Sequence, residues 1–362
     1  MIEYVEGDLL KADADALVNT VNTVGVMGKG VALQFKQAFP SNFKAYWAAC
    51  KRGEVRVGEM FVFDAGQITK PRYIINFPTK THWKARSRLA DVESGLTDLR
   101  RVVKELNVTS IAVPPLGCGN GGLDWRDVRP LITAALGDLE EVHVLVFEPK
   151  GAPRANQMKV GTAKPRMTRG RAVLIGLLDR YLGLADLGAS PIEVQKLVYF
   201  VQRAGEPLRL NFETGRYGPY AEALSHVLEA MEGHYVRGYG DRSRKVPEAE
   251  PITLVDGAAD EARAWLGAHP ESVDRIDRVL ELTDGFQSAY EMELLAIVDW
   301  VANGPDGAAK NDSRVAFHHV QHWNERKRRL FTERHVALAW RRLSELGWFE
   351  TPVFADRPAL RS

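Results

Sequence analysis

Short apolar runs alternate with longer amphipathic stretches over the first 150 residues. The short runs predict strands at Ile2–Val5, Ala16–Asn19, Met60–Phe63, Tyr73–Asn76, Ser110–Val113 and Val142–Phe147. The longer stretches, in which apolar residues recur every three or four positions, predict helices at Gly30–Cys50, Leu89–Leu106 and Asp124–Leu136. This alternation predicts an α/β fold, a three-layer α/β/α sandwich with a mixed sheet.

From about Gly170 onward the apolar spacing becomes helical almost throughout. The predicted helices are Ala172–Leu184, Ile192–Arg203, Tyr220–Met231, Asp260–Leu266, Ser272–Thr283, Tyr290–Val301 and Arg334–Leu346. A chain of 362 residues is long enough for two cores. We therefore expect a mainly α-helical second domain.

A basic segment separates the two patterns. Residues 156–171 hold five basic and no acidic residues, together with Gly161, Pro165 and Gly170, which is typical of a solvated linker. The predicted domains are 1–155 and 172–362, with the linker at 156–171.

Charge and cysteine content narrow the functional class. The net charge is +1, but residues 172–300 hold 12 basic and 22 acidic residues, a net of −10. This acidic stretch predicts a basic partner. Two cysteines, Cys50 and Cys118, are too few for a disulfide framework, and no apolar run approaches the roughly 20 residues that span a bilayer. We expect a soluble protein of the cytoplasm.

Two glycine-rich loops follow predicted strands and precede predicted helices. The first contains Gly25, Gly28 and Gly30, and the second is Pro114–Leu123 (PPLGCGNGGL). Glycines let backbone amides approach a phosphate, and the helix N-terminus adds partial positive charge. Neither loop matches the GxxxxGK[ST] pattern of nucleoside-triphosphate sites. Two such loops point to a diphosphate ligand; the alternative is a pair of tight turns without a ligand.

Polar residues at the ends of predicted strands fit the same site. Asp8, Asn22, Lys80 and the loop Gly117–Gly122 each follow a strand. In an α/β/α sandwich the ligand crevice lies where loops leave the carboxyl ends of strands. We expect these groups to converge there.

Three segments together resemble the ligand-binding signature of macrodomains. They are Gly7-Asp8-Leu9, the Asn19/Asn22 turn with Gly28-Lys29-Gly30-Val31-Ala32, and Gly117-Cys118-Gly119. The resemblance covers about residues 1–150 and implies an ADP-ribose pocket. Asp8 would meet the adenine amino group beside the Leu9 backbone. Alternatively, Asp8 is a turn cap and Asn22 closes an Asx-turn. The implied ligand residues are Asp8, Leu9, Asn19, Asn22, Gly28, Lys29, Gly30, Val31, Gly117, Cys118, Gly119, Asn120 and Gly121.

Lys80, in the sequence NFPTKTHW, distinguishes an enzyme from a reader of ADP-ribose. It resembles the catalytic lysine of the lysine-dependent ADP-ribosyl glycohydrolase branch, although most loop lysines are solvated charges. An amine there can attack the anomeric carbon of the distal ribose, or its ring-opened aldehyde, and form a Schiff base. Partial burial and cations such as Lys29 or Lys84 would lower its pKa. The expected catalytic pair is Lys80 and Asn22, without a metal or cofactor.

The second glycine-rich loop departs from one form of that branch. Members that act on protein glutamate esters carry an aspartate where this chain has Gly121, and Asp124 is better explained as a helix N-cap. The departure matches antitoxins of DNA ADP-ribosylating toxin–antitoxin pairs, whose implied reaction removes ADP-ribose from thymine in single-stranded DNA. His82, Trp83 and Lys84 are candidate DNA contacts, although Trp83 alternatively closes the sheet as a buried aromatic. A non-catalytic ADP-ribose-binding module and a protein-ADP-ribose glycohydrolase remain alternatives.

The second domain carries QKLVYFVQ near Gln195, GEPL at Gly205 and GRYGPYAEAL from Gly215. These segments resemble the antitoxin-associated Panacea (SocA-like) domain, which implies a cognate DNA ADP-ribosyltransferase toxin as partner, neutralised by contact. The alternative is a plain helical bundle. His318, His319 and His322 lack partners at metal-ligand spacing, and the NERKRRL run is expected to be a solvated face.

Overall fold

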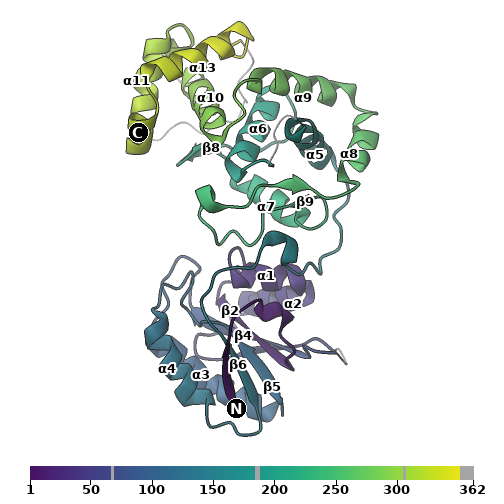
Figure 1. Cartoon of the computed structure of the whole chain (residues 1–362), viewed down its shortest axis with the longest axis vertical. Coiled ribbons are helices and arrows are strands. Elements are labelled where there is room, and N and C mark those ends of the chain that lie inside the picture. Colours follow the sequence, from purple (N-terminus) through teal and green to yellow (C-terminus); the bar gives the residue numbers. More distant parts are fainter. Residues whose placement is uncertain (67–68, 184–187, 305–306, 351–362) are drawn as a thin grey trace. The chain divides into compact units, whose positions relative to one another are not determined.

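The computed structural model of the chain describes residues 1–66, 69–183, 188–304 and 307–350. The chain forms two compact units (Figure 1). The first consists of residues 1–163 together with 240–245, and the second of residues 164–239 and those from 246 onward. Each unit is described below by itself.

A six-stranded sheet forms the centre of the first unit. Its strands are β1 (Ile2–Val5), β2 (Ala16–Asn22), β3 (Phe61–Asp64), β4 (Tyr73–Lys80), β5 (Ser110–Val113) and β6 (His143–Phe147). Their order is β1-β6-β5-β2-β4-β3, and every pair is parallel except β3 with β4. The mixed sheet is confirmed. The carboxyl ends of its five parallel strands share one edge.

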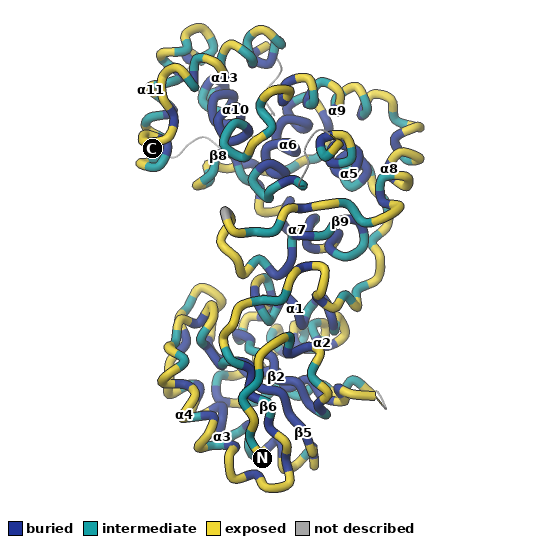
Figure 2. Tube along the Cα trace, in the orientation of Figure 1, coloured by how far each residue is buried: buried dark blue, intermediate teal, exposed yellow. Residues whose placement is uncertain are grey.

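Alternate residues of the central strands pack into two different cores. Val18 and Ile75 belong to the core that contains α3 (Leu89–Glu105) and α4 (Trp125–Leu136). Leu17 and Ile74 belong to the core that contains α1 (Val31–Ala38). Successive strand residues point to opposite faces, so helices cover both faces, and Figure 2 shows the strands as the buried layer. The three-layer prediction is confirmed.

The predicted helix Gly30–Cys50 is wrong as a single element. The structure has two helices, α1 and α2 (Pro40–Lys51), separated at Phe39, whose φ is −131° and ψ is 69°. Proline at position 40 cannot donate its backbone amide and disfavours helical geometry in the residue before it. The chain therefore turns at Phe39 and begins α2 with proline in its first turn.

Strands β2 and β4 extend further than predicted, to Asn22 and Lys80 in place of Asn19 and Asn76. The amides within them are buried and paired: Asn19 Nδ2 donates to Asn76 Oδ1 at 3.0 Å, and Asn76 Nδ2 donates to Asn42 Oδ1 at 2.7 Å. Polar residues thus continue the strands because their side chains find partners inside. The extension makes Asn22 and Lys80 register partners.

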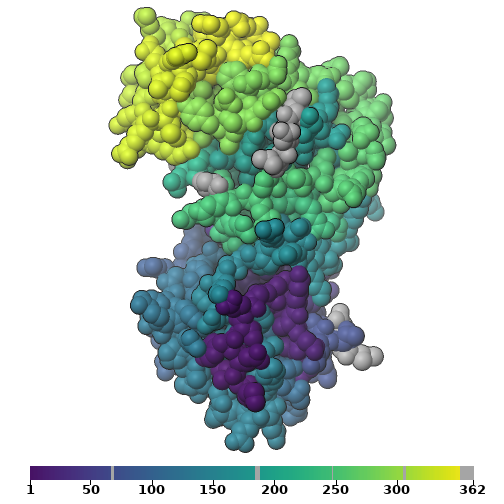
Figure 3. All heavy atoms as spheres, in the orientation of Figure 1, coloured from purple at the N-terminus to yellow at the C-terminus, as the bar shows by residue number. Residues whose placement is uncertain are grey.

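The termini of the first unit meet in the sheet. Ile2 pairs with Val144 and Val5 with Phe147. In the space-filling view of Figure 3, the purple atoms of the first residues accordingly lie among the blue-teal atoms of the unit's later residues. The short 3₁₀ helices η1 (Leu9–Lys11) and η2 (Ala155–Gln157) complete this unit.

The second unit is mainly helical, as predicted, around a core shared by α5, α6 and α10. Its longer helices are α5 (Arg169–Leu182), α6 (Pro191–Arg203), α7 (Glu222–Met231), α8 (Ala258–Leu266), α9 (Pro270–Thr283), α10 (Ala289–Ala302), α11 (Ser313–Gln321), α12 (Glu325–Leu330) and α13 (Glu333–Glu345). Two small antiparallel sheets pair β7 (Glu213–Gly215) with β8 (Gly218–Tyr220), and β9 (Val236–Arg237) with β10 (Thr253–Leu254). The unit also contains the short 3₁₀ helices η3 (Val246–Glu248) and η4 (Ala308–Lys310). Helices α11 and α12 were not predicted, and Leu184, the expected end of α5, lies outside the described residues.

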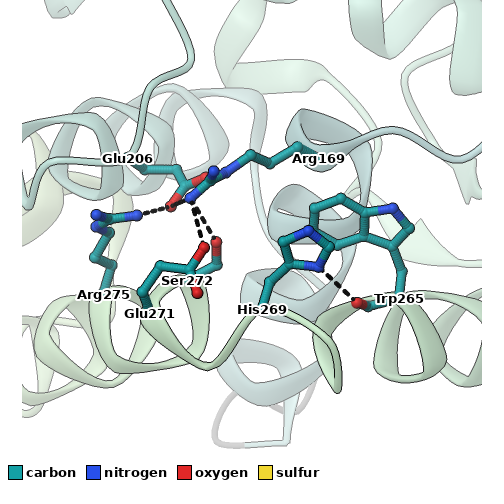
Figure 4. A network of polar contacts seen from close by, with 7 residues as sticks. All are labelled: Arg169, Glu206, Trp265, His269, Glu271, Ser272 and Arg275. Carbon is teal, nitrogen blue, oxygen red and sulfur yellow. Dashed lines mark hydrogen bonds and ion pairs between the residues drawn. The ribbon is translucent and has the colours of Figure 1, made fainter.

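A buried carboxylate connects three segments of this unit (Figure 4). Glu206, 1% exposed, accepts from Arg275 Nη1 at 2.9 Å and pairs with Arg169, which also donates to Ser272 Oγ at 3.1 Å. A buried carboxylate is tolerated when it is paired and hydrogen-bonded. The network joins the start of α5, the turn after α6 and the first turn of α9.

The prediction that the NERKRRL run is a solvated face is wrong for one residue. Lys327 on α12 is fully buried, and it pairs with the equally buried Glu293, which also accepts from Arg326 Nη1 at 2.8 Å. Burial lowers the pKa of Lys327 to about 7. No described helix combines the length and apolarity that crossing a bilayer requires.

Candidate functional site

Lys80 lies at the carboxyl end of β4 with its amine held between two carbonyls. Its Nζ donates to the backbone oxygen of Asn120 at 3.0 Å and to that of Trp83 at 3.2 Å, and the residue is 9% exposed. Burial lowers the pKa of this amine, because desolvation penalises the charged form. The predicted contribution of Lys29 and Lys84 is not among the causes. Lys80 is therefore an oriented amine, and a solvated surface charge is excluded.

The second glycine-rich loop carries the carbonyl that holds Lys80. It is closed by backbone bonds from Leu123 N to Gly117 O at 3.1 Å and from Gly122 N to Gly119 O at 3.1 Å. Gly117 has a φ of +72°, which favours glycine. Burial, then the charges of Asp124 and Asp127, raise the pKa of the neighbouring Cys118 to about 11. This thiol is therefore protonated at neutral pH and is a poor nucleophile.

Gly121 has no room for a side chain. A Cβ there would lie 2.3 Å from both Gly117 O and Ser87 Oγ. The Ser87 amide also donates to Gly121 O at 3.0 Å, which pins the position to the segment that precedes α3. An aspartate cannot occupy this position in the observed loop. Asp124 accepts from Arg126 N at 2.9 Å, which confirms it as the N-cap of α4.

The side chain of Asn22 shapes the first loop. Its Oδ1 accepts from Val24 N at 3.0 Å and Val26 N at 3.3 Å, while its Nδ2 donates to Val26 O at 2.5 Å. Tyr46 Oη adds a bond to the Asn22 carbonyl at 2.6 Å. The Asx-turn interpretation is confirmed, and direct contact of Asn22 with a ribose stays a prediction.

The two glycine-rich loops meet. A Cβ on Gly30, whose φ is +64°, would lie 3.0 Å from Asn120 Nδ2. Lys29 is exposed, Gly28 and Val31 are partly exposed, and Val31 begins α1. Asn19 lies inside the protein, where its Nδ2 approaches Met27 Sδ at 3.8 Å and supports the loop from within. The predicted convergence of Asn22, Lys80 and the second loop is thus observed, whereas the expected position of Asp8 beside them stays a prediction.

Asp8 caps a turn and keeps one oxygen free for another donor. Its Oδ1 accepts from Leu10 N at 3.0 Å, so the turn-cap interpretation is correct. Its Oδ2 is buried without a hydrogen-bond partner among the described residues, and Lys11 Nζ lies 3.8 Å away. Leu9 is buried in the core with Phe35. A buried acceptor that receives no hydrogen bond from the described residues suits a ligand amino group.

His82, Trp83 and Lys84 form an exposed turn next to Lys80. Trp83 is 49% exposed, so the alternative of a buried aromatic closing the sheet is wrong. The rings of His82 and Trp83 lie 5.4 Å apart, and Lys84 Nζ lies 4.9 Å from the Trp83 ring centroid. This turn offers an aromatic face and a cation to solvent.

Sequence reasoning missed Asp241. It belongs to the segment 240–245 of the first unit, although β9 and β10 on either side of it belong to the second. Its backbone oxygen accepts from Gly30 N at 2.8 Å, and its Oδ2 accepts from Gln34 Nε2 at 2.6 Å. Asp241 therefore engages an amide that was predicted to face a phosphate. The sequence signals only a local turn, with Ser243 donating to Asp241 Oδ1.

The described part of the chain contains no cluster of side chains suited to bind a metal ion. No group of three or more His, Cys, Asp or Glu side chains there is arranged to hold an ion. His318 and His322, on and just after α11, have ring centroids 4.4 Å apart without such a third partner. The candidate site consists of an amine, backbone amides and one carboxylate oxygen that accepts no hydrogen bond from the described residues.

Comparisons with known proteins identify the family of the chain. The Macro domain family matches residues 18–132. The DNA ADP-ribosyl glycohydrolase of Mycobacterium tuberculosis is 46% identical, over 95% of this chain and 99% of its own. The DNA ADP-ribosyl glycohydrolase of Thermus aquaticus is also 46% identical, over 99% of this chain and 97% of its own. The solved macrodomain of Thermus aquaticus DarG is 60% identical over 41% of this chain and 99% of its own, with a TM-score of 0.40. With this identity along nearly its whole length, the chain belongs to the DNA ADP-ribosyl glycohydrolase family, the DarG proteins.

Proposed function

We propose that this DNA ADP-ribosyl glycohydrolase releases ADP-ribose from thymine bases in single-stranded DNA, and that Lys80 supplies the reacting amine. The observation that carries the proposal is the position of Lys80 Nζ, buried at a strand end and oriented by Asn120 O and Trp83 O. The lowered pKa of this amine increases the neutral fraction, which is the nucleophilic form. Binding of ADP-ribose alone does not require a buried, oriented amine of this kind.

The remaining groups fit the parts of ADP-ribose. Asp8 Oδ2, buried without a hydrogen bond from the described residues and 3.8 Å from Lys11 Nζ, is an acceptor for the adenine amino group. The meeting point of Gly30 and Asn120 brings backbone amides and the start of α1 together for the diphosphate. With the diphosphate bound there, the distal ribose lies toward Lys80, which contacts the same Asn120.

The chemistry follows from the amine. Lys80 Nζ attacks the anomeric carbon, the bond from that carbon to the thymine nitrogen breaks, and one proton of the amine passes to that nitrogen. The resulting ribosylamine then opens its ring: the bond from the anomeric carbon to the ring oxygen breaks, the second amine proton passes to that oxygen, and a Schiff base is left. Water then hydrolyses the Schiff base and regenerates Lys80, so that free ADP-ribose and unmodified DNA are the products. Asn120 O and Trp83 O hold Nζ in position for this attack.

Gly121 favours a DNA substrate over a protein ester. Lysine-dependent glycohydrolases that act on protein glutamate esters carry an aspartate at this position. In this chain a Cβ at Gly121 would overlap Gly117 O and Ser87 Oγ. A lysine–aspartate pair is therefore incompatible with this loop. The expected linkage is one that the amine cleaves without a second acid.

We further propose that the second domain binds and inhibits a DarT-like DNA ADP-ribosyltransferase toxin. Residues 172–300 carry a net charge of −10, and a toxin that acts on DNA presents a basic groove. Charge complementarity then accelerates association and is screened by salt. Raising the ionic strength from 0.05 to about 0.3 M should slow association severalfold; a rate that does not change with salt would argue against the acidic stretch.

The central experiment compares wild type, Lys80→Ala and Lys80→Arg on a thymine-modified single-stranded oligonucleotide. Arginine retains a cation for the two carbonyls but is not a nucleophile, so both variants should lose release while keeping ADP-ribose binding. Cyanoborohydride should trap ADP-ribose covalently on wild type only. Equal release by all three proteins would refute the Lys80 mechanism. Faster turnover of modified peptides than of oligonucleotides would identify a protein substrate.

A further inference from the structure

Two half-exposed tryptophans lie at the same edge of the first unit as Lys80. Trp83 is 49% exposed and Trp47, on α2, is 47% exposed, and both are among the large apolar side chains most open to solvent. Isolated apolar side chains on a surface are ordinary. These two, however, are each connected to the end of a central strand.

Hydrogen bonds make that connection. Lys80 at the end of β4 donates to the backbone oxygen of Trp83. Tyr46, the residue before Trp47, donates from its hydroxyl to the backbone oxygen of Asn22 at 2.6 Å, at the end of β2. Asn22 and Lys80 are register partners. The two tryptophans are therefore connected to the ends of the two neighbouring strands that carry the candidate site.

The loops between the tryptophans are also in contact. Thr23 donates from its amide (3.2 Å) and its hydroxyl (2.8 Å) to the backbone oxygen of Thr81. Two residues further, Gly25 packs against the indole, because a Cβ there would lie 3.1 Å from Trp47 Cδ1. We call the surface formed by Trp47, Lys51, residues 23–25 and residues 81–84 the tryptophan ledge.

Each tryptophan of the ledge has a lysine beside its ring. Lys51 Nζ lies 5.5 Å from the Trp47 ring centroid, and Lys84 Nζ lies 4.9 Å from that of Trp83. Within the described residues neither lysine forms an ion pair, whereas the nearby Arg52 is paired with Glu54 at 2.6 Å. The ledge thus presents two aromatic faces with two cations that are available to an anionic partner.

From this arrangement we infer that the tryptophan ledge binds single-stranded nucleic acid, with Trp47 and Trp83 stacking on nucleotides near the modified thymine and Lys51 and Lys84 contacting their phosphates. The inference rests on the proposed function, because the modified base must enter at Lys80. Aromatic side chains interleaved with cations are the usual surface for single strands, since every base has a face that can stack. Val24, within the ledge, is 44% exposed and adds apolar area, so binding of a protein partner is the alternative outcome of the test below.

The test uses the full chain and two substrates: an ADP-ribosylated single-stranded oligonucleotide and ADP-ribosyl-thymidine, which lacks flanking nucleotides. Trp47→Ala should lower kcat/KM on the oligonucleotide by roughly five- to a hundredfold, the range expected for one lost base stack, and its rate on ADP-ribosyl-thymidine should be unchanged. Trp83→Ala should also lower kcat/KM on the oligonucleotide, but only Trp47→Ala is compared on ADP-ribosyl-thymidine, because the backbone oxygen of Trp83 holds Lys80. Trp47→Phe, which keeps a stacking ring, should retain most of the oligonucleotide activity.

Charge variants keep the inference testable if a tryptophan variant fails to fold. Lys51→Ala should weaken binding of an unmodified oligonucleotide, measured by fluorescence anisotropy, and should reduce the salt slope by about 0.7, as expected for one lost contact to a single strand. Lys104→Ala removes the same charge from the far end of α3, just before β5, and should change neither quantity.

The possible results distinguish failure of the ledge as a DNA-binding surface from failure of the proposed glycohydrolase activity. Equal losses on both substrates, or no loss on the oligonucleotide, would overturn the ledge as a nucleic-acid surface. Loss of toxin binding by Trp47→Ala with intact oligonucleotide activity would assign the ledge to a protein partner instead. If wild type releases ADP-ribose from neither substrate, the proposed function fails, and the anisotropy measurement still decides whether the ledge binds DNA.

Discussion

Replacing Gly121 by alanine tests whether the shape of the second glycine-rich loop controls the position of Lys80. The new Cβ would lie 2.3 Å from Gly117 O and from Ser87 Oγ, where an ordinary contact needs about 3.4 Å. The shortfall of about 1 Å is too large for small adjustments, because one of the two neighbours is backbone. The loop must shift, and with it Asn120 O, the acceptor that holds Lys80 Nζ at 3.0 Å.

A displacement of about 1 Å at a reacting group costs on the order of a hundredfold in rate. Overpacking at a close contact costs roughly 1–3 kcal/mol of stability, which for a unit of this size lowers the melting temperature by about 2–12 °C. We therefore expect Gly121→Ala to fold, to melt lower, and to release ADP-ribose from the modified oligonucleotide about a hundredfold more slowly in single-turnover assays.

Gly119→Ala is the matched control for stability. It lies in the same loop, but a Cβ there meets no atom within 4 Å, so its melting temperature should equal or slightly exceed that of wild type. If Gly121→Ala melts like Gly119→Ala and keeps the wild-type rate, the loop does not position Lys80 as argued. Gly121→Asp should be at least as damaging as Gly121→Ala, and a gain of activity on modified peptides would contradict the steric argument directly.

Three further predictions concern other charged groups. The release rate should rise with pH and level off below the ordinary lysine pKa of 10.5, because burial lowers the pKa of Lys80 and the neutral amine reacts; a rate still rising at pH 10.5 would contradict this. Asp241→Ala should tighten ADP-ribose binding severalfold in calorimetry, since it removes the negative charge that Gln34 of α1 binds near this helix N-terminus, while the backbone oxygen that accepts from Gly30 N remains; weaker binding would show that the 240–245 segment supports the loop. Glu293→Gln should cost about 3–5 kcal/mol in denaturant unfolding because two buried or half-buried cations lose their partner, whereas Lys327→Met should cost clearly less because Arg326 still pairs with Glu293; equal costs would refute that assignment.

Local pattern determined much of the fold in advance. Strands β1 and β5 begin and end where alternation predicted, and the N-cap at Asp124 follows from its side-chain chemistry. The break at Phe39 was also readable, because Pro40 cannot continue a helix. The apolar spacing continues through Pro40 and predicts one helix, but the proline divides it into α1 and α2.

Other features depend on tertiary contacts that no local pattern encodes. Asn19 and Asn76 look like strand ends, but buried amide pairing carries both strands onward and places Lys80 inside a strand. Lys327 looks solvated within a basic run, yet a carboxylate on another helix draws it into the core. Asp241 is more than 200 residues from Gly30 in sequence, and its bond depends on how the later chain returns to the first unit.

The same tertiary dependence explains why the amine of Lys80 is placed on a strand. A lysine on a free loop would keep its ordinary pKa and lose rotamer freedom on reaching a substrate. As the last residue of a buried parallel strand, Lys80 has its backbone fixed by β2, and its Nζ is fixed by the carbonyls of two different loops. Burial then lowers the proton affinity that the two carbonyls would otherwise raise. The fold thus supplies orientation through hydrogen bonds and reactivity through desolvation, and in the proposed mechanism one side chain carries the reaction without the aspartate that Gly121 excludes.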